Sequence, residues 1–293
     1  MQIFYELNKN PNLSLALGFF DGVHIGHQSV IKSAIKYAKT NGNKSAVITF
    51  KDHPCCYLWN LKPKYILTPK TRENIIEDLG IDYLYELDFE SISGLTGKEY
   101  LKDILINHFM PVSISTGWNH NFGHKKSGNV KLLEESSKKY GYNFFELPPQ
   151  KINNEIISST KIRSLLEKGN IKKANDMLGH NFNINGKIVK GNQIGRTIGY
   201  KTANINYPKD IIEIPYGVYC VETNYGKGIA NFGIRPTVNG SAPVLEVHIL
   251  DFDKDIYGKN IDISFNKMIR KEQKFKSLDE LKNQIQKDIK SIL

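Results

Sequence analysis

Cysteine is scarce in this chain of 293 residues, which contains only Cys55, Cys56 and Cys220. An odd number of cysteines with one adjacent pair provides neither a disulfide framework nor the ligand spacing of a zinc site. Long apolar runs are also absent: none approaches the ~18 residues of a membrane span, and residues 1–11 contain no apolar signal core. These absences argue against a disulfide-rich secreted protein and a membrane protein, and they predict a cytoplasmic location.

Acidic residues are fewer than basic ones, 30 against 40, which gives a net charge of +10. This charge suits either nucleic acid or a smaller anion such as a nucleotide phosphate. The lysines are spread along the chain and form no basic arm, and no nucleic-acid recognition motif is present. Nucleic-acid binding is therefore kept only as a remote alternative, and no nucleic-acid partner is expected.

Strand and helix patterns alternate in the first half of the chain. Expected strands cover 13–20, 45–50, 82–87, 112–116 and 142–147; expected helices cover 25–39 and begin near Thr68-Pro69 and at a capping box of Thr96 and Glu99. Strands separated by helices predict a mainly parallel sheet that is covered on both faces. Ligands bind such sheets at the carboxyl ends of the strands.

The second half of the chain has a different pattern. Short β-like runs separated by Gly, Pro and Asn occur at 183–189, 217–222, 228–232, 244–250 and 261–265. They predict a small barrel or sandwich, and a final helix is expected to start at Ser277. The change of pattern places a domain boundary near residue 180, which gives two domains, 1–180 and 181–293.

The most specific local motif is G-F-F-D-G-V-H-I-G-H at residues 18–27, between an expected strand and an expected helix. A helix start presents free N–H groups and a positive dipole end to an anion. Glycine at 22 and 26 allows a tight turn and a close approach to phosphate. His24 and His27 are able to face the same point and stabilise charge that develops on a phosphate. An incidental surface histidine pair and a metal pair are the competing interpretations.

A second motif, I-S-S-T-K-I-R at residues 157–163, places hydroxyl groups before cations at an expected helix start. That order suits a polyphosphate tail. An ordinary helix cap with surface charges is the alternative.

Two stretches of the second half carry candidate chemistry. The segment 191–204 is rich in glycine and polar residues, and Thr202 and Asn204 offer oxygen ligands suited to Mg²⁺. Glu246 lies in an apolar β-like run, and alternation places it on one face with His248 and Leu250. A carboxylate beside a ligand pocket acts as a general base; a surface loop and a solvent-facing strand residue are the alternatives.

The first two motifs resemble the H-x-G-H and I-S-S-T-x-x-R signatures of the nucleotidylyltransferase superfamily. The amino-acid sequence of residues 18–28 is similar to the corresponding stretch of bacterial FAD synthetases. T-F-K-D-H-P at 49–54 and G-W-N-H-N-F-G at 117–123 resemble two further segments of that family. In the second segment, His120 stands where the family usually has Phe.

The resemblance implies roles for individual residues in this module. His24 and His27 hold the α-phosphate of ATP as catalytic residues, and Asn119 contacts the flavin nucleotide. The remaining residues of the ATP site are Gly18, Phe20, Asp21 and Gly26, with Ser159, Thr160 and Arg163 on the triphosphate. The implied reaction is attack of an FMN phosphate oxygen on the α-phosphorus of ATP, with release of pyrophosphate and with Mg²⁺ assisting.

The later segments resemble, in order, the motifs of the riboflavin kinase module: 191–204, N-F-G-I-R-P-T at 231–237, E-V-H-I-L-D-F at 246–252, Tyr257-Gly258 and 269–275. Thr202 and Asn204 are implied to bind Mg²⁺ and nucleotide phosphate, and Glu246 to activate the riboflavin 5′-hydroxyl. Arg235 and Arg270 are implied to bind flavin, Arg270 on a loop that closes over it.

As a whole, the chain resembles bacterial bifunctional riboflavin kinase/FAD synthetases. That family implies an α/β fold: a Rossmann-like nucleotidylyltransferase domain followed by a small antiparallel β-barrel of riboflavin kinase type with a C-terminal helix. ATP, riboflavin, FMN and FAD are the expected partners, Mg²⁺ is the expected cofactor, no membrane partner is expected, and the oligomeric state is left open.

One departure from the family concerns the kinase module. Lys201 replaces the Pro of the family's P-T-A-N turn. Proline fixes its own φ, so its loss is expected to loosen the Mg²⁺-binding turn, unless Lys201 has been recruited to a phosphate. An FAD synthetase with a barrel that binds flavin but phosphorylates weakly is therefore the main alternative function.

Overall fold

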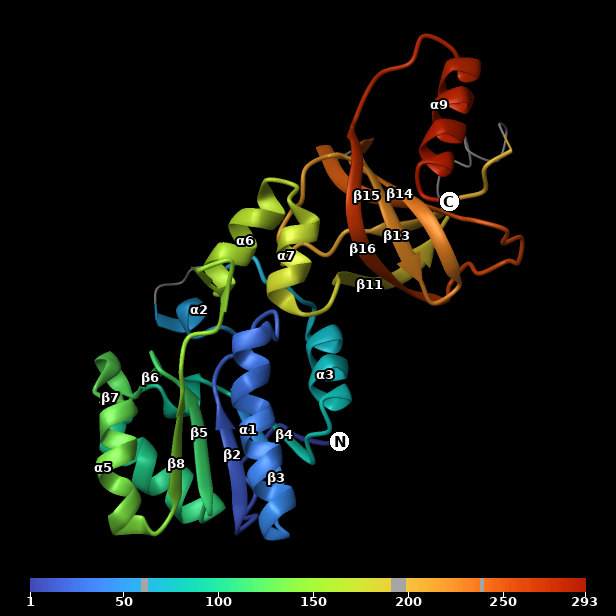
Figure 1. Cartoon of the computed structure of the whole chain (residues 1–293). Helices are drawn as coiled ribbons and strands as arrows, with labels where there is room; N and C mark the ends of the chain where they lie inside the picture. Colours follow the sequence, from blue (N-terminus) through green and yellow to red (C-terminus); the bar gives the residue numbers. More distant parts are fainter. Residues whose placement is uncertain (59–62, 191–198, 238–239) are drawn as a thin grey trace. The chain divides into compact units, whose positions relative to one another are not determined.

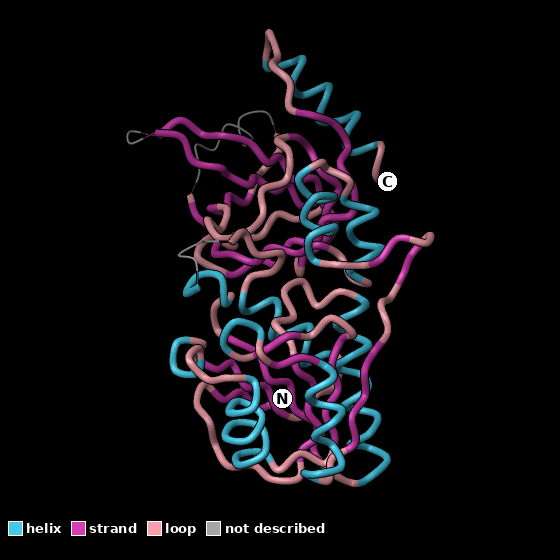
Figure 2. The backbone as a smooth tube through the Cα atoms, turned by 90° about the vertical axis from the view of Figure 1, so that its left-hand side faces the viewer, coloured by secondary structure: helices cyan, strands magenta, loops and turns pink. Residues whose placement is uncertain are grey.

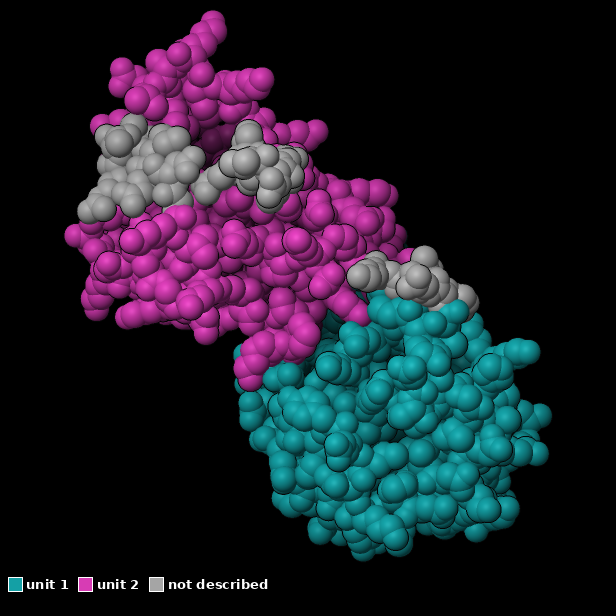
Figure 3. All heavy atoms as spheres, turned by 180° about the vertical axis from the view of Figure 1, so that it is seen from behind, with its two compact units in different colours: residues 1–63, 72–158 teal, residues 64–71, 159–293 magenta. Residues whose placement is uncertain are grey.

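The computed structural model describes residues 1–58, 63–190, 199–237 and 240–293, with the side chains of 235–242 outside the description. It divides into two compact units: unit 1 comprises residues 1–63 and 72–158, and unit 2 comprises 64–71 and 159–293 (Figure 3). The domain boundary near residue 180 stays a prediction. Helices α6 (Ser159–Glu167) and α7 (Ile171–Leu178) belong to unit 2.

Unit 1 is built on a six-stranded sheet in which every neighbouring pair is parallel. The strand order is β1-β4-β3-β2-β5-β8. Their bounds are β1 Gln2–Phe4, β2 Leu13–Leu17, β3 Lys44–Phe50, β4 Tyr83–Leu87, β5 Ser113–Gly117 and β8 Asn143–Leu147. The predicted parallel α/β sheet is confirmed, and only its short edge strand β1 was not expected.

Helices cover both faces of this sheet (Figures 1 and 2). On one face lies α1 (Ile25–Asn41), where Ser115 Oγ of β5 donates to Ser33 Oγ at 3.0 Å. On the other face, η2 (Tyr100–Phe109) contributes Leu101, Leu105 and Phe109 to one core with alternate residues of β2. Burial on both faces explains why the strands read as continuous apolar runs.

The remaining elements of unit 1 are short. They are α2 Pro54–Leu58, α3 Pro69–Asp78, η1 Glu90–Ile92, α4 Gly97–Glu99, β6 Asn121–Phe122, η3 His124–Lys126, β7 Gly128–Asn129, α5 Val130–Tyr140, β9 Lys151–Ile152 and β10 Glu155–Ile156. Residues 69–71 of α3 belong to unit 2. The capping box of Thr96 and Glu99 is present as predicted, and it begins the helical run that η2 continues.

Unit 2 contains a closed barrel with the strand order β11-β12-β15-β14-β13-β16, in which all pairs are antiparallel. The bounds are β11 Phe182–Val189, β12 Ala203–Asn206, β13 Gly217–Thr223, β14 Gly226–Thr237, β15 Gly240–Ile249 and β16 Asn260–Lys271. Closure settles the choice between barrel and sandwich. Strand β12 was missed because it is short and follows a polar segment.

The C-terminal helix α9 (Leu278–Lys290) begins at the predicted N-cap, Ser277, whose side chain accepts from Glu280 N. The apolar residues Ile285 and Ile289 of α9 pack with Val218 and Cys220 of β13. β13 is therefore buried on its outer face as well as inside the barrel. In the described part of the chain, no helix combines the length and apolar character needed to cross a bilayer.

Candidate functional site

The turn between β2 and α1 lies at the carboxyl end of a central strand. β2 pairs with β3 on one side and β5 on the other, so the turn lies where the strand order reverses direction, the usual ligand position in such sheets. Phe20, Gly22 and Val23 have positive φ angles of 58°, 83° and 40°. Phe20 and Val23 are fully buried, and such strain in residues with side chains persists only where the surroundings hold it.

His24 and His27 lie together at the start of α1. His24 is the N-cap, its Nδ1 accepts from His27 N at 3.2 Å, and it is only 6% exposed. The two imidazole rings are stacked, with centroids 3.6 Å apart and an interplanar angle of 18°. The structure therefore brings the two predicted catalytic histidines together at the positive end of a 17-residue helix.

The other residues predicted in this motif pack around the histidines. A Cβ at Gly18 would lie 2.9 Å from the Phe20 ring, and a Cβ at Gly26 would lie 3.1 Å from the His24 ring. The Phe20 ring meets His27 edge-on, at 5.3 Å between centroids, and Asp21 is buried. The two glycines are thus required for close packing of the side chains beneath and beside the imidazoles.

The segment 117–123 follows β5 at the same edge of the sheet. Asn119 and Trp118 are exposed, while the His120 ring stacks on Phe122 with centroids 5.6 Å apart. Desolvation lowers the pKa of His120 from 6.5 to about 4, so the ring is neutral at pH 7. Gly123 has a φ of 71°, and a Cβ there would lie 2.4 Å from Gly97 N. The segment is thus closely packed, with a neutral aromatic ring where the family has Phe.

The second predicted phosphate motif lies at the start of α6, in unit 2. Ser159 is the first residue of this helix, and Thr160 follows it and is exposed. Arg163 Nε donates to Lys64 O at 3.0 Å within the same unit. The expected position at a helix start is confirmed; the phosphate role stays a prediction.

The barrel brings the predicted metal ligands and the predicted base onto neighbouring strands. Asn204 of β12 is the direct cross-strand partner of Glu246 of β15. Ala203 pairs with Val247, so Asn204, Glu246 and His248 alternate onto the opposite face, where Asn204 is buried and Glu246 half-buried; Thr202 directly precedes β12. The predicted shared face of Glu246 and His248 is confirmed. Thr202, Asn204 and Glu246 carry oxygen donors, and no group of three or more His, Cys, Asp or Glu side chains in the described residues is arranged to hold a metal.

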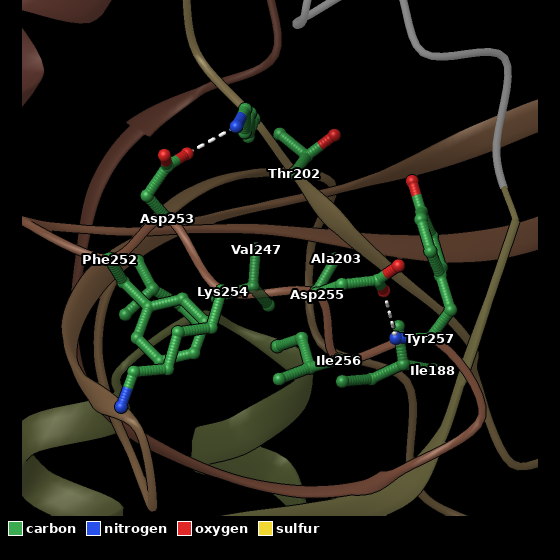
Figure 4. Close-up of a pocket in the computed structure, with 12 residues that line it drawn as sticks. Ile188, Thr202, Ala203, Val247, Phe252, Asp253, Lys254, Asp255, Ile256 and Tyr257 are labelled. Carbon is green, nitrogen blue, oxygen red and sulfur yellow. Dashed lines mark hydrogen bonds and ion pairs between the residues drawn. The ribbon is translucent and has the colours of Figure 1, made fainter.

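A pocket of about 240 Å³ opens beside Thr202 (Figure 4). One part of its wall is apolar and the other polar or charged; the lining residues are Ile188, Ala203, Val247, Ile249, Phe252 and Ile256, with Lys201, Thr202, Asp253, Lys254, Asp255 and Tyr257. Glu246 and Asn204 do not line this pocket. A flat ring with a charged extension is the kind of ligand that such a wall accommodates.

Lys201 is held at the edge of this pocket by two contacts. Its ammonium forms an ion pair with Asp253, and the two side chains are 52% and 84% exposed. Its carbonyl lies 2.8 Å from Nδ1 of His248, and the His248 ring meets Tyr200 edge-on. The sequence suggested two roles for Lys201, a loosened turn or a phosphate contact, and neither included an ion pair with Asp253. That partner was not identifiable because it lies 52 residues further along the chain.

The predicted flavin ligand Arg270 forms an ion pair with Asp288 of the C-terminal helix α9. Its Nε lies 3.1 and 3.0 Å from the two carboxylate oxygens of Asp288, and its Nη2 lies 2.9 Å from Oδ2. Asp288 is buried and also accepts from Gln284. The backbone of Arg235 lies in β14, and its side chain is outside the described residues.

One buried ion pair was not anticipated from the sequence. Nη2 of Arg72 in α3 donates to Oε1 of Glu86 in β4 at 2.5 Å, and both side chains are buried. Glu86 was the one residue from which such a pair could have been predicted, since a carboxylate inside an apolar parallel strand is rarely buried without a cationic partner. Its partner was not identifiable, because α3 carries several charged residues.

Comparisons with known proteins cover nearly the whole chain. A family model described as FAD synthetase matches residues 6–161, and one described as riboflavin kinase matches residues 178–293. A Buchnera aphidicola protein named bifunctional riboflavin kinase/FMN adenylyltransferase is 36% identical over 293 residues, which span 97% of this chain and 94% of that protein. The Escherichia coli K12 protein of the same name is 34% identical, with 94% and 90% covered.

A solved structure shares the complete fold. A crystal structure described as a macrolide-efflux protein from Streptococcus pneumoniae aligns with a TM-score of 0.90 and 31% identity, over 100% of this chain and 99% of that chain. The similarity therefore extends over both compact units.

The shifted pKa of His120 has a consequence for stability. An unfolded His120 takes up its proton near pH 6.5, whereas the folded one resists protonation until about pH 4. Acidification through this range therefore favours the unfolded state. We expect the thermal midpoint of His120→Phe to fall less than that of the unchanged chain between pH 6.5 and 4. Between pH 7 and 8 the two slopes should agree; equal slopes in the acid range as well would contradict the assignment.

Proposed function

This chain belongs to the bifunctional riboflavin kinase/FMN adenylyltransferase family, and we propose that it phosphorylates riboflavin to FMN and then adenylylates FMN to FAD. The observation that carries the proposal is the presence of both domains in one chain, with relatives of that name aligned over at least 94% of it. The assignment of roles to individual residues below is our own.

Adenylyl transfer is proposed to take place at the turn that leads into α1. A phosphate oxygen of FMN attacks the α-phosphorus of ATP, the bond from that phosphorus to the bridging oxygen breaks, and pyrophosphate leaves. Negative charge grows on the α-phosphate, where the stacked imidazoles of His24 and His27 and the N–H groups of α1 stabilise it. No covalent intermediate with the protein is required, so positioning and charge stabilisation suffice.

Several roles in this reaction rest on the family resemblance alone. Binding of the triphosphate by Ser159, Thr160 and Arg163 stays a prediction, as does contact of Asn119 with the flavin. The same holds for flavin binding by Arg235 and Arg270. The pairing of Arg270 with Asp288 favours a structural role for that arginine, since its guanidinium already has a carboxylate partner.

Phosphorylation of riboflavin is proposed to use the outer face of β12 and β15. The Glu246 carboxylate takes the proton of the riboflavin 5′-hydroxyl as that oxygen attacks the γ-phosphorus of ATP, and ADP leaves. Asn204 lies directly across from Glu246 and, with Thr202, supplies neutral oxygen donors. Such donors fit Mg²⁺ whose other ligands are phosphate oxygens and water, and Mg²⁺ would supply charge neutralisation there.

The pocket beside Thr202 is proposed to hold the nucleoside of the kinase ATP. Its apolar wall, which includes Val247, Phe252 and Ile256, suits a purine ring. Thr202, one of the proposed Mg²⁺ ligands, lines the pocket itself and directly precedes β12, so a nucleotide bound there is able to place a phosphate at this hydroxyl. The presence of Thr202 in both sets of residues is what supports kinase activity in the barrel.

We expect His27→Ala to lower FMN adenylylation by about 10²- to 10³-fold, because one preorganised charge stabiliser is lost. Riboflavin phosphorylation should be unchanged, since its proposed residues lie in the barrel. The measurement is initial FAD and FMN formation from separate FMN and riboflavin assays. The exposed His124 provides the control variant His124→Ala; unchanged FAD formation in His27→Ala would remove this imidazole from the site.

Glu246→Gln should have the opposite selectivity. The amide is unable to accept the hydroxyl proton, so riboflavin phosphorylation should fall by about 10²- to 10⁴-fold while adenylylation of FMN persists. Glu222→Gln, at an exposed residue of barrel strand β13, which is separated from β15 by β14, is the matched control. A joint loss of both activities would point to misfolding in place of a catalytic role.

The ion pair of Lys201 leads to a comparison of two substitutions. Lys201→Met removes the ion pair with Asp253. Because the pair is exposed, we expect the activation free energy of riboflavin phosphorylation to rise by about 1 kcal/mol or less. Lys201→Pro removes the same pair but presets φ in the turn, so its kinase rate should exceed that of Lys201→Met and of the unchanged chain. Adenylylation of FMN is the folding control. A large loss in both variants would instead assign the ammonium to a phosphate.

A further inference from the structure

The guanidinium of Arg72 contacts the carboxyl ends of three neighbouring strands in unit 1. Its Nη2 donates to Glu86 Oε1 in β4 at 2.5 Å and to Phe50 O at the end of β3 at 3.3 Å. Its Cζ lies 5.4 Å from the ring centroid of Phe19, which follows β2. Strands β4, β3 and β2 are adjacent in the sheet, so one side chain connects their ends at the edge where ligands bind.

Stability alone does not account for this pair. Arg72 and Glu86 are 5% and 4% exposed, and Nε of Arg72 has no hydrogen-bond partner among the described residues. Burial of two charges costs more than their attraction returns unless the remaining donors are satisfied, and an apolar pair of similar volume is often at least as stabilising. A buried donor without a protein partner is uncommon in folded proteins and calls for a specific explanation.

Phe19 links this ion pair to the histidine turn. Thr49 Oγ1 donates to Phe19 O at 2.9 Å, and the His53 ring meets the Phe19 ring edge-on with centroids 4.5 Å apart. The guanidinium over the ring adds a cation–π contact. Phe19 directly precedes Phe20, the first residue of the strained turn. Fixing the backbone and the ring of Phe19 therefore fixes where that turn begins.

We propose that Arg72, held in place by Glu86, is a positioning residue for adenylyl transfer. The pair acts through Phe19 on the turn that carries His24 and His27, and neither member touches the substrate. The inference rests on the proposed adenylyl transfer and adds a determinant of its rate. Since displaced imidazoles lose transition-state contacts before they lose substrate binding, kcat should fall while KM for ATP changes little.

A double substitution separates positioning from stability. The single variants Arg72→Met and Glu86→Leu each leave one buried charge unpaired, so both should lower the thermal midpoint. The double variant Arg72→Met/Glu86→Leu replaces the pair by apolar side chains and should recover that midpoint. Its kcat for FMN adenylylation should nevertheless remain about 10- to 100-fold below that of the unchanged chain. Riboflavin phosphorylation, measured in the same samples, should be unaffected.

Arg72→Lys supplies the conservative comparison. An ammonium keeps the charge for Glu86 but lacks the planar fork that also reaches Phe50 and Phe19, so it should restore kcat only in part. The control is Glu77→Gln on the same helix, whose exposed carboxylate pairs with the N-terminal amine and should not affect kcat.

The outcomes distinguish the inference from the function on which it rests. A double variant with recovered midpoint and full kcat would overturn the inference and leave the pair a purely structural feature. If the double variant does not fold, full kcat in Arg72→Lys would overturn it equally. An unchanged chain that forms no FAD would contradict adenylyl transfer itself, and the inference with it.

Discussion

Positive backbone φ angles at Phe20, Gly22 and Val23 bend the chain sharply between β2 and α1, and the position of both imidazoles depends on that bend. Two of these residues carry side chains for which the conformation is strained, so the turn requires buried packing to hold it. The Phe20 ring packs against His27, Gly18 leaves room for the Phe20 ring, and Gly26 leaves room for the His24 ring. The fold of unit 1 thus serves to hold one strained turn at the edge of the sheet.

In unit 2, the corresponding constraint is strand register. Register places Asn204 opposite Glu246 on the face away from Ala203 and Val247, and a shift by one residue would turn both side chains to the other face of the sheet. Closure of the barrel fixes this register, because β16 pairs with β11 as well as with β13. The two chemistries therefore depend on different physical devices, a strained turn in one case and cross-strand pairing in the other.

Patterns local in sequence predicted most of the fold. Helical spacing located α1, alternation placed Glu246 and His248 on one face, and the motif of residues 18–27 located the strained turn. Contacts between distant residues were not predictable: Lys201 with Asp253, Arg270 with Asp288, and Arg72 with Glu86. Each joins a charged side chain to one of several equivalent candidates, and only the folded chain selects among them.

The central claim is that one chain performs two successive phosphate transfers to flavins. The most direct measurement is a time course in which the protein is incubated with riboflavin and Mg-ATP and the flavins are separated by chromatography. The account predicts that FMN appears first and FAD follows, with pyrophosphate released in the same amount as FAD. Conversion of added FMN to FAD without any conversion of riboflavin would reduce the barrel to a binding domain. Absence of both products would contradict the account.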